Sequence, residues 1–192
     1  NCHFPLPAPL ATIRPRFAPV LASASREAGV GRVLCVANQK GGVGKTTTAV
    51  NLAAGLAKAG AYVLLVDLDP QCNATSGLGA EPSETHPLVA GRSLGDSLLE
   101  TGVTRLDLLP GSRSFRDVEA LTRDDEGQSA RLRHHLTGGL SAYDYVLIDC
   151  PPSLGPLTRT ALASSTEVLM PIQCEYFAME GLAQMIEVIR DV

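Results

Sequence analysis

The sequence predicts an α/β domain with a doubly wound, mostly parallel sheet, and three observations support this fold class. Short apolar runs of strand length recur along the chain. Segments with a helical spacing of apolar residues alternate with these runs. A glycine-rich loop or an aspartate follows directly after several of the apolar runs. Such alternation is typical of a parallel sheet that binds its ligand outside the carboxyl ends of the strands.

The predicted elements follow one another in a regular order. Apolar runs predict strands over residues 33–37, 62–67, 105–109, 145–149 and 167–170. Helical patterns predict helices over residues 46–59, 93–100, 115–121, 130–136, 156–164 and 177–190. Gly60 is expected to end the first helix, and residues 69–92 read as a loop. The apolar face of the last helix is expected to contain Met179, Leu182, Met185, Ile186 and Ile189.

Length and composition exclude several classes of protein. The chain has 192 residues and a net charge of −4, which fits one ordinary domain and argues against a protein whose whole surface binds nucleic acid. No run approaches 18 uninterrupted apolar residues, so we expect no transmembrane helix. The five cysteines include no C-x-x-C pair. They are typical of reduced intracellular thiols in apolar surroundings rather than of disulfides, a zinc site or an iron–sulfur cluster.

The first 30 residues differ from the rest of the chain. Residues 1–30 are rich in Pro, Ala and Arg and have no clear periodicity, which is typical of a disordered leader. A targeting peptide and an artefact of cloning or gene assignment stay open as alternatives. We therefore expect a single domain over residues 31–192.

The glycine-rich run at residues 40–47 indicates phosphate binding. Its glycines allow successive backbone N–H groups to turn toward an anion. Lys45 adds a positive charge for the terminal phosphates, and the Thr46 hydroxyl suits Mg²⁺. The run follows a predicted strand and opens a predicted helix, which directs the helix N-terminus at the phosphates. The nucleotide-binding candidates are Gly41, Gly42, Val43, Gly44, Lys45, Thr46 and Thr47.

The loop departs from the strict P-loop pattern in a specific way. Gln39 stands where that pattern has its first glycine, and Lys40 adds a second lysine at the front of the loop. This resembles the deviant Walker A motif of the ParA/MinD/nitrogenase iron-protein group of ATPases. The resemblance implies a sheet of P-loop NTPase type. It also implies that Lys40 acts on a nucleotide held by the partner subunit, as an arginine finger does.

Three carboxylates, those of Asp67, Asp69 and Asp149, fall at or just after the ends of predicted strands. Phosphoryl transfer needs a phosphate cradle, a held Mg²⁺ and a group that orients the attacking water. Asp149 has a Walker-B-like placement that suits Mg²⁺, although an aspartate here could instead cap the next helix. Asp69 lies in a loop that could fold over the γ-phosphate, although Asp-Pro is also a common turn dipeptide.

Four segments together resemble the chromosome- and plasmid-partitioning ParA/Soj family in order and spacing. They are residues 38–48, 66–71, 145–154 and 173–181. The resemblance implies that Asp69 positions the water for hydrolysis and that Asp67 lies nearer the metal, which Thr46 and Asp149 also hold. It further implies ATP and Mg²⁺ as cofactors, an ATP-dependent sandwich homodimer, and non-specific binding to nucleoid DNA in the cytoplasm. A ParB-type partner would stimulate hydrolysis and so release the protein.

The chain also departs from the family pattern. Cys72 stands where the family usually has glycine, in the expected switch loop. Cys150 and Cys174 replace other small residues, and we expect both at buried strand positions. The family domain continues further at its carboxyl end, where it supplies the last strands, much of the adenine pocket and the basic DNA surface. The resemblance therefore implies a fragment whose sheet is incomplete at the C-terminus.

Three other functions stay open at the level of sequence. A MinD-like positioning ATPase would bind a membrane through a C-terminal amphipathic helix, although residues 69–75 favour the partitioning branch. A small-molecule ligase or kinase would use the same cradle but needs a substrate pocket. A truncated nucleotide-binding module would hold nucleotide without hydrolysing it, which the presence of Asp69 and Asp149 argues against.

Overall fold

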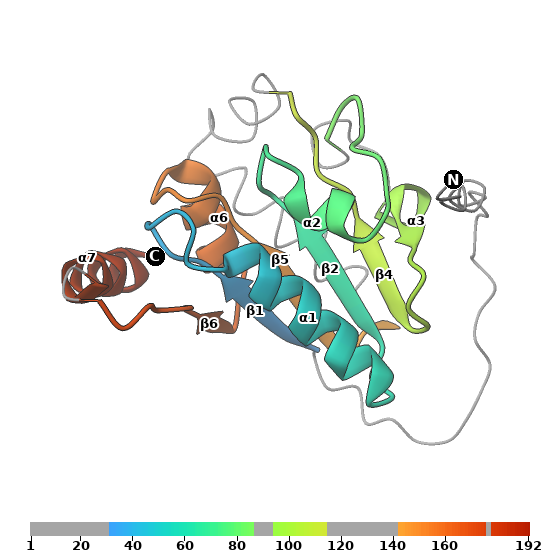
Figure 1. Cartoon of the computed structure of the whole chain (residues 1–192), viewed down its shortest axis with the longest axis horizontal. Helices are drawn as coiled ribbons and strands as arrows, with labels where there is room; N and C mark the ends of the chain where they lie inside the picture. Colours follow the sequence, from blue (N-terminus) through green and yellow to red (C-terminus); the bar gives the residue numbers. More distant parts are fainter. Residues whose placement is uncertain (1–30, 87–93, 115–141, 176–177) are drawn as a thin grey trace, which may run out of the picture.

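A computed structural model describes residues 31–86, 94–114, 142–175 and 178–192. These residues form a six-stranded sheet with the order β3-β4-β2-β5-β1-β6 (Figure 1). The strands are β1 (Arg32–Val36), β2 (Val63–Asp67), β3 (Leu99–Glu100), β4 (Leu106–Leu109), β5 (Tyr145–Asp149) and β6 (Glu167–Leu169). All neighbouring pairs are parallel except β3 and β4, which are antiparallel. The predicted α/β fold with a mostly parallel sheet is confirmed.

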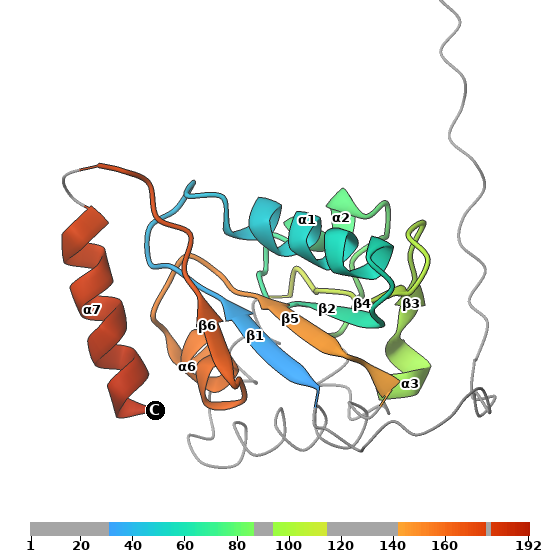
Figure 2. The ribbon, with the colours of Figure 1, turned by 90° about the horizontal axis from the view of Figure 1, so that it is seen from below.

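Helices cover both faces of the sheet, as Figure 2 shows from its edge. They are α1 (Lys45–Lys58), α2 (Asn73–Gly77), α3 (Leu94–Ser97), α6 (Pro156–Ala163) and α7 (Ala178–Asp191). Helices α1 and α2 pack on one face around one hydrophobic cluster. Helices α6 and α7 contribute buried residues to a second cluster, which lies on the opposite face. None of the helices in the described ranges combines the length and hydropathy that a membrane span requires.

The central strands are buried on both faces, which explains their continuous apolar runs. All five residues of β2 are buried. Val63 and Leu65 belong to the cluster beneath α1, whereas Leu64 and Val66 belong to the cluster with α6 and α7. Successive side chains of a strand point to opposite faces, so a strand covered on both sides has no polar alternation.

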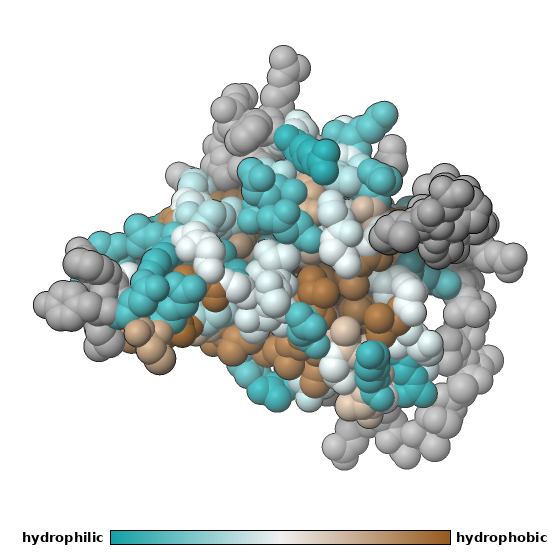
Figure 3. All heavy atoms as spheres, in the orientation of Figure 1, coloured by the Kyte–Doolittle hydropathy of each residue, from teal (hydrophilic) through white to brown (hydrophobic). Residues whose placement is uncertain are grey.

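Helix α1 lies against the sheet along a stripe of small residues. Ala49, Ala53 and Ala57 are buried and recur every four residues, which places them on one face of the helix. The helix ends at a C-cap, Ala59, and Gly60 then adopts a φ of +104°, so Gly60 terminates the helix as predicted. In the surface view of this side, hydrophilic residues gather over the loop that precedes α1, and apolar residues are visible beside the helix (Figure 3).

The structure corrects several predicted elements. The loop expected over residues 69–92 contains the short helix α2. The helix expected over residues 93–100 is shorter, because α3 gives way to strand β3. On α7, Val188 is buried, whereas Ile186 is 39% exposed and was wrongly placed on the packed face. The helices expected over residues 115–121 and 130–136, and the leader over residues 1–30, lie outside the described residues.

Candidate functional site

The site residues meet at the carboxyl ends of three neighbouring central strands. Strand β5 lies between β1 and β2, and Asp149 pairs in register with Val36 on one side and with Asp67 on the other. The glycine-rich loop follows β1, and Asp69 follows β2. The fold therefore brings together the three segments that the sequence placed in one site.

The glycine-rich loop presents its backbone to the space in front of α1. Gly42 and Gly44 have φ values of 73° and 87°, a region that residues with a Cβ rarely adopt. Gly44 is also the N-cap of α1 and provides no side-chain hydrogen bond to the helix. The N–H groups of the first helical turn are therefore not capped by the N-cap side chain, which is the arrangement of an anion site.

Lys45 folds back over this loop. Its side chain is only 6% exposed, and Nζ donates a hydrogen bond of 2.9 Å to the carbonyl oxygen of Lys40. Burial lowers the pKa of Lys45, while the carboxylates of Asp149 and Asp69 oppose that shift. The ammonium group is thus held at the loop, facing the two carboxylates.

The Asp149 oxygens have no hydrogen-bond partner of normal geometry among the described residues, although the Thr46 hydroxyl lies close enough to lower the pKa of this carboxyl. Asp149 is 0% exposed. The pKa of Asp149 is raised to about 7, mainly by burial. The carboxylates of Asp67 and Asp69 contribute to this rise, while the nearby Thr46 hydroxyl and Lys45 ammonium oppose it. A buried carboxylate with unfilled acceptor positions is suited to bind a metal cation or a hydrogen-bond donor.

Asp67, in contrast, is enclosed by hydrogen bonds from the loop that follows β2. Its Oδ2 accepts bonds from the Thr75 backbone N–H at 2.8 Å and from the Thr75 hydroxyl at 2.6 Å. Its Oδ1 accepts a bond from the Asp69 N–H at 3.1 Å. Burial is the main cause that raises the pKa of Asp67, and the bonds from Thr75 and Asp69 lower it. Both oxygens of this carboxylate therefore hold the loop in place through hydrogen bonds.

Asp69 begins a tight turn that Cys72 closes. The Asp69 Oδ1 atom accepts a bond of 2.9 Å from the Gln71 N–H, and the Asp69 carbonyl accepts one of 2.8 Å from the Cys72 N–H. Cys72 has a φ of 52° and is fully buried. The backbone therefore takes the left-handed conformation that suits the glycine expected here, even though a cysteine occupies the position.

The segment after β6 contacts the glycine-rich loop. The Lys40 ammonium forms an ion pair with Glu175, and Gln173 Nε2 donates a bond of 3.3 Å to the Gly42 carbonyl. Asn38 links the two segments, because its Nδ2 donates to the Pro171 carbonyl at 2.8 Å and its Oδ1 accepts from the Lys40 N–H at 3.0 Å. Lys40 is thus held by its own chain.

The cysteines of the described residues differ in their exposure to solvent. Cys35, Cys72 and Cys150 are buried, and the sulfur atoms of Cys35 and Cys150 lie 3.4 Å apart. Cys174 is exposed, which corrects its expected place in a buried strand. The chain turns away from the sheet after Leu169, so Cys174 lies in the segment beside the glycine-rich loop.

Some residues of the site were given no role of their own by the sequence. Thr75 and Gly111 hydrogen-bond to each other over 36 positions, and no local pattern reports such a contact. Gln173 and Glu175 lie in one of the four segments that resemble the ParA/Soj family, but that resemblance assigned neither residue a role. In the described parts of the chain, no group of three or more His, Cys, Asp or Glu side chains is placed to hold a metal ion.

The comparisons with known proteins agree with this geometry. A family model described as an AAA domain matches residues 31–192. The Soj sporulation initiation inhibitor of Bacillus subtilis is 45% identical over 136 residues, 68% of this chain and 54% of that protein. The chain belongs to the ParA/Soj family of partitioning ATPases. The ParA chromosome partitioning protein of Myxococcus xanthus is 46% identical over 163 residues, 82% of this chain and 58% of that protein.

Solved structures share the ParA/Soj fold seen here. The cobyrinic acid a,c-diamide synthase of Mycobacterium smegmatis, with bound ADP and magnesium, has a TM-score of 0.78 and 40% identity, covering 84% of this chain and 68% of that one. A plasmid partition protein of Borrelia burgdorferi has a TM-score of 0.74 and 28% identity, covering 84% and 74%. The chain spans only somewhat more than half the length of the curated ParA/Soj relatives it matches.

Proposed function

We propose that this chain is the nucleotide-binding part of an ATP-driven switch that acts in DNA segregation. The observation that carries the proposal is the convergence of a two-lysine glycine loop with Asp69 and Asp149 at neighbouring strand ends. Membership of the ParA/Soj family supports the same function.

The phosphates of ATP would bind at the loop before α1. The uncapped N–H groups of residues 42–46 offer hydrogen bonds, and the buried Lys45 ammonium supplies charge. Binding would replace the bond from Lys45 to the Lys40 carbonyl by a stronger, charge-assisted one. The related structures with ADP or an ATP analogue and magnesium support this assignment.

Mg²⁺ fits the chemistry of Asp149 and Thr46. The two unpartnered oxygens of Asp149 supply the negative charge that a hard cation prefers. Magnesium keeps several waters and takes phosphate oxygens as ligands, so few protein ligands suffice. When bound, the ion would neutralise charge on the phosphates. A place for Asp67 near the metal stays a prediction. Both of its oxygens already accept hydrogen bonds, so they are less available than those of Asp149 to bind the ion.

Hydrolysis needs a group that orients water and a charge that stabilises the transferred phosphoryl group. We assign the first part to Asp69, whose turn fixes one carboxylate oxygen through the Gln71 N–H. We assign the second to Lys40, acting on the nucleotide of a second copy. This assignment requires Lys40 to leave Glu175 of its own chain.

The partners belong to the same proposal. Family membership supports an ATP-dependent homodimer, non-specific binding to nucleoid DNA in the cytoplasm and stimulation by a ParB-type protein. These steps belong to proteins longer than the stretch matched here.

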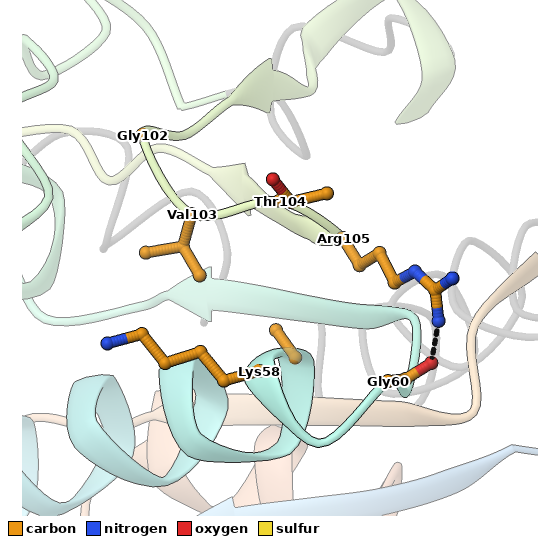
Figure 4. Close-up of a pocket in the computed structure, with 7 residues that line it drawn as sticks. Lys58, Gly60, Gly102, Val103, Thr104 and Arg105 are labelled. Carbon is orange, nitrogen blue, oxygen red and sulfur yellow. Dashed lines mark hydrogen bonds between the residues drawn. The ribbon is translucent and has the colours of Figure 1, made fainter.

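One observation favours a second candidate, an ATP-dependent amidating ligase. It is the 40% identity to the structure described as a cobyrinic acid a,c-diamide synthase. The pocket shown in Figure 4 does not serve this chemistry, because Lys58, Gly60 and Arg105 line it at the far end of α1 from the glycine-rich loop. ATP turnover without an amide acceptor would favour the switch, whereas turnover only with an acceptor and a nitrogen donor would favour the ligase.

The proposal is tested by nucleotide binding and ATP turnover in Lys45→Ala. A fluorescent ATP analogue with Mg²⁺ serves as the binding probe, and phosphate release measures turnover. We expect affinity to fall at least about a hundredfold, because the phosphates lose a buried charge-assisted bond. Lys58→Ala is the matched control, since Lys58 is the third lysine of the chain and is exposed at the other end of α1.

Each arm of this experiment addresses a separate part of the proposal. An unchanged nucleotide affinity in Lys45→Ala would contradict the assignment of the phosphate-binding site to Lys45 and the glycine-rich loop. Nucleotide binding by the wild-type chain without any turnover would leave the cradle intact and contradict the hydrolytic function.

A further inference from the structure

The Thr75 hydroxyl lies at the centre of a buried network behind the proposed site. It donates a hydrogen bond of 2.6 Å to Asp67 Oδ2 and accepts one of 2.9 Å from the Gly111 N–H. Thr75 and Asp67 are both 0% exposed. The hydroxyl thus joins helix α2 to the end of β2 and to the turn after β4.

The network extends directly to Asp69. Asp67 holds Thr75 with Oδ2 and the Asp69 N–H with Oδ1. One carboxylate therefore closes the loop between residues 69 and 75 onto the sheet. The backbone position of Asp69 depends on where the Asp67 carboxylate stands, and the Thr75 hydroxyl fixes that carboxylate.

Space around the carboxylate is also restricted. A Cβ atom at Gly111 would lie 3.0 Å from Asp67 Cγ and 3.1 Å from Cys72 Sγ. Gly111 thus allows the turn after β4 to approach closely enough for its N–H to reach Thr75. Replacing the hydroxyl by a methyl group would leave the buried Gly111 N–H without this acceptor, a costly state.

We propose that Thr75 is a positioning residue for ATP hydrolysis, which sets Asp69 through Asp67 without touching the nucleotide. This inference rests on the proposed function for its effect on turnover. Its effect on the loop stands on the hydrogen bonds alone.

The test compares Thr75→Val, which keeps the shape, with Thr75→Ser, which keeps the hydroxyl. Thr158→Val is the matched control, because Thr158 is also buried but its hydroxyl has no partner among the described residues. For Thr75→Val we expect kcat to fall at least about tenfold, the equivalent of one or two lost hydrogen bonds. The affinity for the fluorescent ATP analogue should change less than about threefold, because the phosphate cradle is untouched. Thr75→Ser should keep kcat within about threefold of wild type.

A second readout measures the loop without any turnover. Hydrogen–deuterium exchange of peptides covering residues 68–77 and 110–112 should be roughly tenfold faster in Thr75→Val than in Thr75→Ser. Exchange in α1 should be equal in the two variants, which also reports that both have folded.

The outcomes separate this inference from the proposed function. Equal kcat in Thr75→Val and wild type, or equal losses in the valine and serine variants, would overturn the positioning role. If the wild-type chain hydrolyses no ATP, the proposed function fails. The exchange rates then decide on Thr75, and equal exchange in the valine and serine variants would overturn the inference.

Discussion

At the scale of single residues, the two carboxylates that end β2 and β5 have opposite environments. Asp67 and Asp149 are in-register partners on neighbouring parallel strands and are both fully buried. Asp67 receives three hydrogen bonds from its own loop, while Asp149 receives none from the described residues. The sequence shows two aspartates at equivalent strand ends, and only the fold distinguishes the one with three hydrogen bonds from the one whose oxygens have no such partner among the described residues.

Because the pKa of Asp149 is raised to about 7, we expect the stability of the metal-free protein, prepared in EDTA, to depend on pH. The ordinary pKa of an aspartate is about 3.9, so the native state holds a proton that the unfolded state releases between about pH 4 and 7. Stability contributed by this group is therefore lost as pH rises through that window. Asp149→Asn should raise the free energy of unfolding at pH 8 by on the order of 3 kcal/mol, and the gain should vanish toward pH 4.

Urea unfolding of the metal-free protein at several pH values measures this effect. Asp191→Asn is the control, because Asp191 is exposed at the end of α7. A gain for Asp149→Asn that is the same at pH 5 and pH 8 would contradict the assignment of the penalty to the ionised carboxylate.

At the scale of elements, the segment between β2 and α2 is strained at one position. Cys72 holds a left-handed φ of 52° that favours glycine, and its thiol is buried against the turn at Gly111. Burial raises the pKa of this thiol to about 11. The cysteine therefore adds apolar contact at the cost of backbone strain.

Two substitutions at Cys72 separate strain from contact. Cys72→Ala removes the thiol but keeps the strained Cβ, whereas Cys72→Gly removes both. We expect the glycine variant to unfold with a free energy about 1 kcal/mol higher than the alanine variant, because left-handed backbone costs an L-residue about that much. Urea unfolding measures the difference, and an alanine variant at least as stable as the glycine variant would contradict it.

The elements also indicate how far sequence reasoning reaches. Strands β1, β2, β4, β5 and β6 were predicted to within one or two residues, because strands buried on both faces have continuous apolar runs. Helix α2 was missed, since its Asn, Thr, Ser and Gly residues resemble a loop, and its place is set by contact with Asp67. Ile186 was wrongly placed on the packed face of α7, where Val188 is buried instead, because α7 meets α6 and the sequence did not give the position of α6 relative to it.

The same limit applies to the site. The glycine loop and the carboxylates are local signals at strand ends and were predicted correctly in their placement. Lys40 and Glu175 are 135 positions apart in the chain. No sequence pattern links two residues so far apart, so their ion pair was not predicted. Long-range pairs of this kind follow from the strand order rather than from periodicity.

At the scale of the whole molecule, the role proposed for Lys40 requires a second copy. We expect Asp69→Ala, which should block hydrolysis, to change from a monomer to a dimer in light scattering when ATP and Mg²⁺ are added. In the double variant that also carries Lys40→Ala, this dimerisation should be abolished. The affinity for nucleotide should stay within a few-fold of that of Asp69→Ala alone. Glu175→Gln should lower the ATP concentration needed, because it releases Lys40 from its own chain.

Glu187→Gln is the control for this last variant, since Glu187 is an exposed glutamate on α7. A dimer that forms equally well with Lys40→Ala would contradict the action of this lysine across the interface. Equal ATP requirements for Glu175→Gln and Glu187→Gln would contradict the restraint by Glu175.

The strand order has a consequence for the chain as it emerges from the ribosome. Strands β1 and β2 do not pair with each other, because β5 lies between them. Both loops of the site are therefore synthesised long before Tyr145–Asp149, the strand that aligns them. Until β5 inserts, a nascent chain has the glycine loop and Asp69 but no shared sheet edge to hold them. A ligand that contacts both loops can stabilise their arrangement only after this insertion, so we expect the site to form in one step when β5 pairs with β1 and β2.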